Sequence, residues 1–193
     1  MRKNFTKYNG DKHFTVGGSI SNRILIFDID DTLIYSNATI KVLKNGQFEK
    51  ELTSAEFNNY ILKDDEEFDF TNFDSSKLLF NASLTLYWNI LENEYNKGTH
   101  IAIITARSKP VMIKNFFLRH GIDIKDELIF CCGYSRFPYK GSIQEKKSKV
   151  IEYLYLLGYD EFVFFDDNED NLKMAKSLED KLDINVKIVH AKI

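Results

Sequence analysis

The sequence has few cysteines and no long apolar segment, and each shortage excludes a class of protein. Its two cysteines, Cys131 and Cys132, are adjacent, and neighbouring cysteines rarely bridge each other, so we expect reduced, buried thiols. No apolar run reaches the roughly eighteen residues of a transmembrane helix. Residues 1–14 also lack the apolar core of a secretory signal. We therefore predict a cytoplasmic protein without membrane contact.

The sequence also lacks an excess of positive charge. Its 193 residues carry a formal net charge of -3, with 28% charged and 44% hydrophobic residues. This is the composition of an ordinary soluble globular domain. It excludes the overall basic surface of duplex nucleic-acid binders, although a local basic patch stays open. The length suits one domain with a small insert.

Strand-like and helix-like segments alternate from residue 23 onward. Residues 1–22 are polar and without periodicity, and we interpret them as a flexible N-terminal tail. Continuous apolar runs, typical of strands buried on both faces, lie at residues 24–27, 100–105, 128–131, 162–165 and 186–189. The alternation predicts an α/β domain over residues 23–193, with a Rossmann-like parallel sheet and helices on both faces.

Three amphipathic helices are expected between these runs. Each is followed by a glycine, which tolerates the left-handed conformation beyond a helix end. Their apolar faces are Leu84, Trp88, Leu91 and Tyr95; Ile113, Phe116 and Phe117; and Val150, Ile151, Leu154 and Leu157.

Residues 35–99 interrupt the alternation. Asn45-Gly46 lies between two strand-like runs and predicts a two-residue hairpin turn. Thr53 and Glu56 form a capping-box pattern that predicts a short helix. An acidic stretch rich in phenylalanine follows at residues 64–70. We interpret 35–99 as a small cap or flap insert with a connecting helix, and expect its phenylalanines to pack against the main sheet.

Carboxylates follow the first and fourth predicted strands. Ligands of open parallel sheets bind at the carboxyl ends of the strands. Asp28 and Asp30 follow the first strand, and Asp166 and Asp167 end the fourth. Clustered carboxylates repel one another and favour a cation between them, and hard oxygen ligands suit Mg²⁺.

Groups that can hold a phosphate follow the second strand. Thr105 offers a hydroxyl and Arg107 a guanidinium, both suited to phosphate oxygens. A lysine at the start of the third predicted helix would balance the remaining charge. Lys146, Lys147 and Lys149 are all available there, and helix phase only mildly favours Lys147.

Each of these segments also has another interpretation, but none of the alternatives explains them all together. Asp30-Asp31-Thr32 and 167–171 could each simply begin a helix. A calcium loop needs glycine at its sixth position, where this sequence has Leu33. Lys140-Gly141-Ser142 lacks the ending of a nucleotide-binding P-loop, and the histidines and cysteines lack zinc-site spacing.

Four of these segments together resemble the motifs of the haloacid dehalogenase (HAD) superfamily. Phe27–Leu33 resembles its first motif, Asp-x-Asp-x-Thr after an apolar strand, and Ile103–Thr105 resembles the second. Lys147 resembles the third, and Phe164–Asp167 with Asn171 the fourth. The resemblance covers residues 23 to about 190, outside most of the insert. Thr-Ala-Arg and Asp-Asp-x-x-x-Asn also resemble small bacteriophage HAD proteins and polynucleotide 3′-phosphatase domains.

The resemblance implies a Mg²⁺-dependent phosphomonoesterase with an aspartyl-phosphate intermediate. Asp28 would be the nucleophile, and Asp30 the acid and then the base. Mg²⁺ would be held by Asp28, the main-chain carbonyl of Asp30 and Asp167, with Asp166 beside it. The phosphate ligands would be Thr105, Lys147 and Arg107.

A small cap implies an open site, which leaves several substrates. We rank terminal phosphates of nucleic acid first and nucleotides or small phosphoesters second. The cations expected near the mouth are Lys41, Lys44, Arg107, Lys109 and Arg136, while the acidic run 64–69 would repel a polyanion. A catalytically silent binding or structural protein on a HAD scaffold is the alternative of another class. The intact acids argue against it.

Overall fold

The core of the molecule is one parallel sheet. The computed structural model describes residues 22–53, 56–57 and 60–192, so the predicted tail lies outside them except for its last residue. Five strands lie in the order β10-β9-β1-β7-β8, all parallel. They are β1 (Arg23–Phe27), β7 (His100–Thr105), β8 (Ile129–Cys131), β9 (Glu161–Asp166) and β10 (Asn185–His190). The predicted α/β class and the parallel sheet are confirmed.

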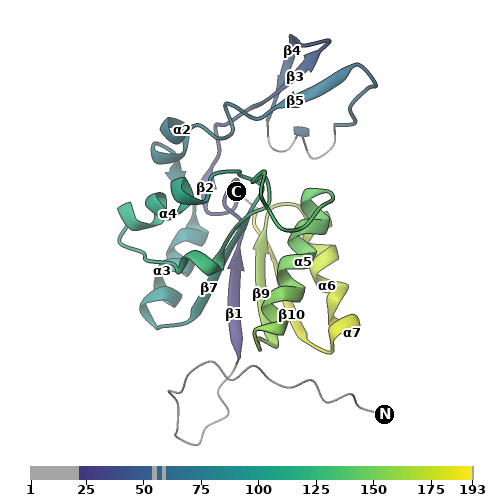
Figure 1. Ribbon diagram of the computed structural model, residues 1–193. Coiled ribbons are helices and arrows are strands. Elements are labelled where there is room, and N and C mark those ends of the chain that lie inside the picture. The colour runs from purple at the N-terminus through teal and green to yellow at the C-terminus, as the bar shows by residue number, and fades with distance from the viewer. Residues whose placement is uncertain (1–21, 54–55, 58–59, 193) are drawn as a thin grey trace, which may run out of the picture.

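Helices cover both faces of this sheet (Figure 1). Because side chains alternate along a strand, Leu25 and Phe27 of β1 join one core cluster and Ile24 and Ile26 join the other. The first cluster lies under α3 (Leu86–Asn96) and α4 (Pro110–Arg119), and the second under α5 (Ile143–Leu156), α6 (Glu169–Lys176) and α7 (Leu178–Leu182). Both faces of the sheet are therefore buried, as the continuous apolar runs predict.

The chain changes direction across the sheet at β1. It runs from β1 outward through β7 to β8, and then returns to add β9 and β10 on the other side of β1. In open α/β sheets this change leaves a crevice at the carboxyl ends of the two strands involved. The carboxyl ends of β1 and β9 are therefore the expected place for a ligand.

The insert is a small antiparallel sheet above those strand ends (Figure 1). It contains β3 (Ile40–Lys44), β4 (Gln47–Leu52) and β5 (Glu66–Asp69), in the order β4-β3-β5. Asn45 and Gly46 have φ angles of 51° and 75°, so the predicted two-residue hairpin is confirmed. The third strand comes from the acidic stretch, to which the sequence analysis assigned no strand.

Short elements connect the insert to the core. β2 (Ile34–Tyr35) pairs with β6 (Ser83–Leu84), and α2 (Ser76–Phe80) precedes β6. The predicted capping box is present, since Thr53 N donates to Glu56 Oε2 at 2.8 Å and Glu56 N to Thr53 Oγ1 at 3.3 Å. Residues 54–55 and 58–59 of the predicted helix lie outside the described residues.

Two predicted helix positions were wrong. Leu84 belongs to β6, because Thr85 is the N-cap of α3 and accepts a hydrogen bond from Tyr87 N. Leu157 is the C-cap of α5 and is 52% exposed. The stripe on α5 instead begins one turn earlier, at Lys147. β8 begins at Ile129, one residue later than predicted, because Leu128 belongs to the 3₁₀ helix η1 (Asp126–Leu128).

Both cysteines are buried and unpaired, as predicted. Cys131 lies in one core cluster and Cys132 in the other. Burial raises the pKa of each thiol to about 12, so both stay protonated. In the described part of the chain, no helix has the length and apolar character needed to cross a bilayer.

The core of this fold predicts a large stability difference between two aromatic positions. Trp88 is 3% exposed and stacks on Phe117 with ring centroids 5.5 Å apart, whereas Phe48 on β4 is 61% exposed. We expect Trp88→Ala to lower the free energy of unfolding by about 3–5 kcal/mol, through lost burial and a residual cavity. Phe48→Ala, the matched control, should change it by no more than about 0.5 kcal/mol. Urea unfolding measures both, and equal losses would contradict this description of the core.

Candidate functional site

Three carboxylates meet where β1 and β9 end. Asp28 follows β1, and its main-chain N–H donates to Phe165 O at 3.0 Å, which extends the strand pairing past the end of β1. Asp166 ends β9 and Asp167 follows it. One carboxylate oxygen from each of the three aspartates lies within 4.8 Å of the others. The structure thus brings together the acids that the sequence placed 138 residues apart.

Lys147 enters this cluster from α5. Ser142 and Glu145 form a capping box that begins the helix. The buried face of α5 then carries Lys147, Val150, Ile151 and Leu154, at the spacing of one helix side. Lys147 is 2% exposed, and its Nζ donates to Asp28 Oδ1 at 2.9 Å and to Asp166 Oδ2 at 2.7 Å.

The neighbouring lysines point elsewhere. Lys146 Nζ donates to Cys132 O at 2.9 Å, and Lys149 Nζ binds Glu152 Oε2 at 2.7 Å. Of the three lysines that the sequence left open, only Lys147 contacts Asp28 and Asp166.

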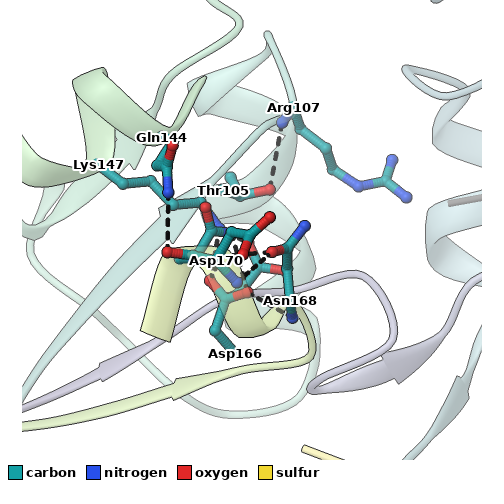
Figure 2. Close-up of polar contacts among 9 residues, drawn as sticks. Thr105, Arg107, Gln144, Lys147, Asp166, Asn168 and Asp170 are labelled. Atoms are coloured by element: carbon teal, nitrogen blue, oxygen red, sulfur yellow. Dashed lines mark hydrogen bonds and ion pairs between the residues drawn. The ribbon is translucent and has the colours of Figure 1, made fainter. Parts of the chain in front are cut away.

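Asp166 is fixed further by α6. Asn171 Nδ2 donates to its two carboxylate oxygens at 3.0 and 3.2 Å, and Asn168 N donates to Oδ1 at 2.9 Å. The Asn168 side chain also caps α6 by accepting from Asp170 N and Asn171 N. Figure 2 shows Lys147 and the start of α6 converging on Asp166. Because the carboxylate oxygens of Asp166 already accept these hydrogen bonds, those of Asp28 and Asp167 are better placed to bind a ligand.

The cluster has more negative than positive charge. Burial by itself would lower the pKa of Lys147, but the charges of Asp166 and Asp28 raise it above its ordinary value, so the ammonium stays charged. Burial raises the pKa of Asp28 well above its ordinary value, although Lys147 opposes this. Burial, and next the Asp166 charge, raise the pKa of Asp167 to about 7. Without another cation, the surplus charge is therefore reduced by bound protons.

This donor set fits a divalent metal ion. Asp28, Asp166 and Asp167 supply only oxygen ligands, which Mg²⁺ prefers. Burial, and after it the neighbouring carboxylates, raise the pKa values of Asp28 and Asp167, so a cation beside these oxygens would be favourable. The Asp30 carboxylate faces elsewhere, so its contribution to such a site would be the main-chain carbonyl that the resemblance implies.

Arg107 is placed differently from the prediction that it binds phosphate. Its Nε donates to Asp30 Oδ2 at 2.9 Å and its Nη2 to Asp30 Oδ1 at 2.6 Å, a bidentate pair. Its Nη1 donates to Phe73 O at 2.5 Å. Arg107 is 1% exposed, and a buried guanidinium needs acceptors of this kind for its donors. In Figure 2 its side chain points away from Lys147 and Asp166.

Thr105 lies at the predicted strand end but deep in the fold. It is fully buried at the end of β7, the strand beside β1, and its Oγ1 accepts from Arg107 N at 3.2 Å. Its neighbours Ala106 and Ser108, rather than Thr105 itself, line the adjoining cleft.

A cleft of about 720 Å³ opens above the cluster, between the core and the insert. Asp28, Asp30, Lys147 and Asp167 line its base. The opposite wall consists of insert side chains, namely Ile40, Phe57, Phe70 and Phe73. The phenylalanines were expected to pack against the main sheet. Phe80 of the insert does so, since it packs on Phe116 of the main core. Phe57, Phe70 and Phe73 instead pack on one another and on Phe68, because the small sheet has its own apolar face.

The insert is connected to this site by contacts that no sequence motif indicates. Ser108 N donates to Asp74 Oδ1 at 3.0 Å, and the Ser108 hydroxyl also binds the Asp74 carboxylate. Asp74 and Phe73 lie beyond the insert sheet, 34 positions before their partners on the β7 loop. In the sequence, Phe73 and Asp74 are marked only by their position just after the acidic stretch. That position does not predict which residues they contact.

The cations expected at the mouth are mostly used elsewhere. Lys44 pairs with Asp65 at 3.4 Å, and Lys109 Nζ donates to Asp74 O at 3.2 Å. Lys41 lies opposite Glu51 and Asp69 in the insert sheet, and Arg136 lines a separate cleft beside β8. None of these four lines the cleft above the acidic cluster.

The raised pKa of Asp167 predicts a pH-dependent stability of the metal-free protein. Between about pH 4 and pH 7 the folded chain keeps a proton on Asp167 that the unfolded chain has released, so raising the pH favours unfolding. Asp167→Asn removes this effect, so the variant should gain stability relative to wild type as the pH rises through that window. Urea unfolding with a chelator at several pH values measures the difference. The surface variant Asp64→Asn is the control, and a pH-independent difference for Asp167→Asn would contradict the shift.

A comparison with solved structures gives a distant likeness. The chain is similar to a hypothetical protein from Pyrococcus horikoshii OT3, with 14% sequence identity and a TM-score of 0.25. The match covers 86% of this chain and 40% of that one. No family model and no curated protein sequence matches the chain. A likeness at this level carries no argument about function, which is therefore argued from the geometry of the site.

Proposed function

We propose that the protein is a Mg²⁺-dependent phosphomonoesterase of the HAD type, with Asp28 as the nucleophile. One observation carries the proposal. Asp28 lies at the carboxyl end of the central strand, bonded to the buried Lys147 and within 4.8 Å of Asp166 and Asp167. A carboxylate in this setting can attack a phosphate only if its charge and that of the phosphate are both compensated. Lys147 and a divalent ion would provide that compensation.

The first step transfers the phosphoryl group to the protein. A carboxylate oxygen of Asp28 forms a bond to phosphorus while the bond from phosphorus to the ester oxygen breaks. The leaving oxygen keeps that electron pair and takes a proton from Asp30. Lys147, which lines the cleft, would donate to the phosphoryl oxygens, whereas Thr105 is fully buried and does not line it. Mg²⁺ held by Asp28 and Asp167, with Asp166 beside it, would add positive charge at the phosphoryl group.

The second step regenerates the carboxylate. Asp30 removes a proton from a water molecule, whose oxygen attacks phosphorus as the bond to Asp28 breaks and phosphate leaves. Arg107 has a different part in this proposal from the phosphate ligand that its sequence position suggested. Its two hydrogen bonds hold the Asp30 carboxylate in one orientation. Arg107 is therefore a positioning residue, and Asp30 is the group that moves protons.

The nucleophile assignment predicts a specific loss of turnover. Asp28→Asn keeps the shape of the side chain but removes the attacking oxygen anion, while Lys147 keeps its bond to Asp166. We expect turnover of a phosphomonoester to fall below about one hundredth of wild type, equivalent to ~2.7 kcal/mol of barrier. Stability should not fall, because the substitution removes a buried charge from a crowded cluster. Asp180→Asn, on the exposed face of α7, is the control and should keep full activity. Turnover above that threshold would exclude Asp28 as the nucleophile.

The metal requirement predicts a second behaviour. Activity should vanish with a chelator and return with Mg²⁺, and it should return less completely with Ca²⁺. Calcium prefers more ligands at longer distances and should therefore misplace the reacting groups. Phosphate release under each condition is the measurement, and full activity with excess chelator would refute the site. A protein that binds Mg²⁺ without any turnover would instead favour the silent HAD-scaffold alternative.

A further inference from the structure

The cleft combines a charged base with an aromatic wall. The side chains at its base are the carboxylates and lysine described above, whereas Phe57, Phe70 and Phe73 face them from the insert. Phe73 is 5% exposed, but Phe70 is 40% exposed. Phe70 therefore presents an uncovered aromatic surface to the cleft.

Neighbouring rings fix the position of Phe70. Its ring centroid lies 5.6 Å from that of Phe57, 5.9 Å from that of Phe68 and 6.4 Å from that of Phe73. Aromatic pairs at these separations attract one another through edge and tilted contacts. The ring is consequently supported by other rings while part of its surface stays accessible, an arrangement suited to stacking against a planar group.

The aromatic wall is also attached to the reacting groups. Arg107 donates to Phe73 O at 2.5 Å, and its guanidinium carbon lies 4.9 Å from the centroid of the Phe73 ring. The same guanidinium holds Asp30 through two hydrogen bonds. The spacing between the wall and Asp30 is thus set by one buried side chain, so a leaving group could contact both.

The charge of the cleft limits how many phosphates a substrate can carry. Its lining includes five carboxylates, of Asp28, Asp30, Asp74, Asp167 and Asp170, but only two lysines, Lys146 and Lys147, among the described residues. Lys147 binds Asp28 and Asp166, and Lys146 binds a main-chain carbonyl. A second phosphate away from the reacting one would meet Asp74 or Asp170 and be repelled.

We infer that the substrate carries a single phosphomonoester and a planar aromatic group that stacks on Phe70, as a nucleoside monophosphate does. This inference rests on the proposed phosphatase function and names its substrate class. It reverses the order that the sequence favoured, in which nucleic-acid ends came first. The reason is that the cations expected at the mouth do not line the cleft, whereas an aromatic surface does.

Substrate preference is the first test. The full chain with Mg²⁺ is assayed on a nucleoside 5′-monophosphate, on glycerol phosphate and on a 3′-phosphorylated oligonucleotide, at low and moderate salt. We expect the nucleoside monophosphate to have the highest kcat/KM, about tenfold above glycerol phosphate, because of base stacking. It should also exceed the oligonucleotide at low salt, where electrostatic steering of a polyanion is strongest.

A pair of variants tests the aromatic wall. Phe70→Ala should raise KM for the nucleoside monophosphate about tenfold and leave glycerol phosphate unchanged, since only the former has a base to stack. Phe70→Trp should retain the preference. Phe48→Ala removes an exposed phenylalanine of the same insert that does not line the cleft, and should change neither substrate.

Binding measurements separate this inference from the proposed function. In Asp28→Asn protein, calorimetry should show the nucleoside monophosphate binding about tenfold more weakly when Phe70→Ala is added. Absence of turnover on all three substrates would refute the phosphatase, while this binding result would still decide the inference. Turnover with equal use of glycerol phosphate, equal losses in Phe70→Ala, or preference for the oligonucleotide would overturn the substrate class and leave the phosphatase intact.

Discussion

The buried ammonium of Lys147, held between Asp28 and Asp166, is the interaction on which the site depends. Its charge offsets part of the cost of burying these two carboxylates, because removing a charge from water is costly unless it is paired. The two hydrogen bonds of the lysine also connect α5 to the ends of β1 and β9, whose spacing is set by their own backbone pairing.

One ammonium cannot neutralise three carboxylates. Burial, and after it the repulsion from the neighbouring carboxylates, raises the pKa values of Asp28 and Asp167, although Lys147 opposes this. A divalent ion would displace the bound protons and satisfy the same oxygens. Relief of the repulsion among these carboxylates would favour metal binding, which supports the proposed Mg²⁺ dependence.

Arg107 connects this charged centre to the insert. It pairs with Asp30 and donates to the Phe73 carbonyl, and Ser108 beside it binds Asp74. The insert is thereby attached to the loop after β7 and not merely positioned above the sheet. In the proposed reaction this places the proton-transferring Asp30 and the aromatic wall in one rigid unit, so the choice of leaving group and the protonation of its oxygen are physically linked.

The sequence by itself determined the sheet, its buried strands and the acids at the ends of two of them. Continuous apolar runs predict strands covered on both faces, and polar residues ending such runs must meet at one edge of a parallel sheet. Asn45-Gly46 likewise determined the hairpin, because both positions need a left-handed backbone that these residues tolerate.

Only the tertiary structure decided which lysine enters the site. Lys147 lies on the buried face of α5 with Val150 and Ile151, whereas Lys146 and Lys149 bind other partners away from the acidic cluster. It also decided the partner of Arg107 and the direction of the insert phenylalanines. The first depends on contacts between residues more than thirty positions apart, and the second on contacts between neighbouring elements of the insert. The periodicity of a sequence predicts helices and strands, but it does not predict such contacts.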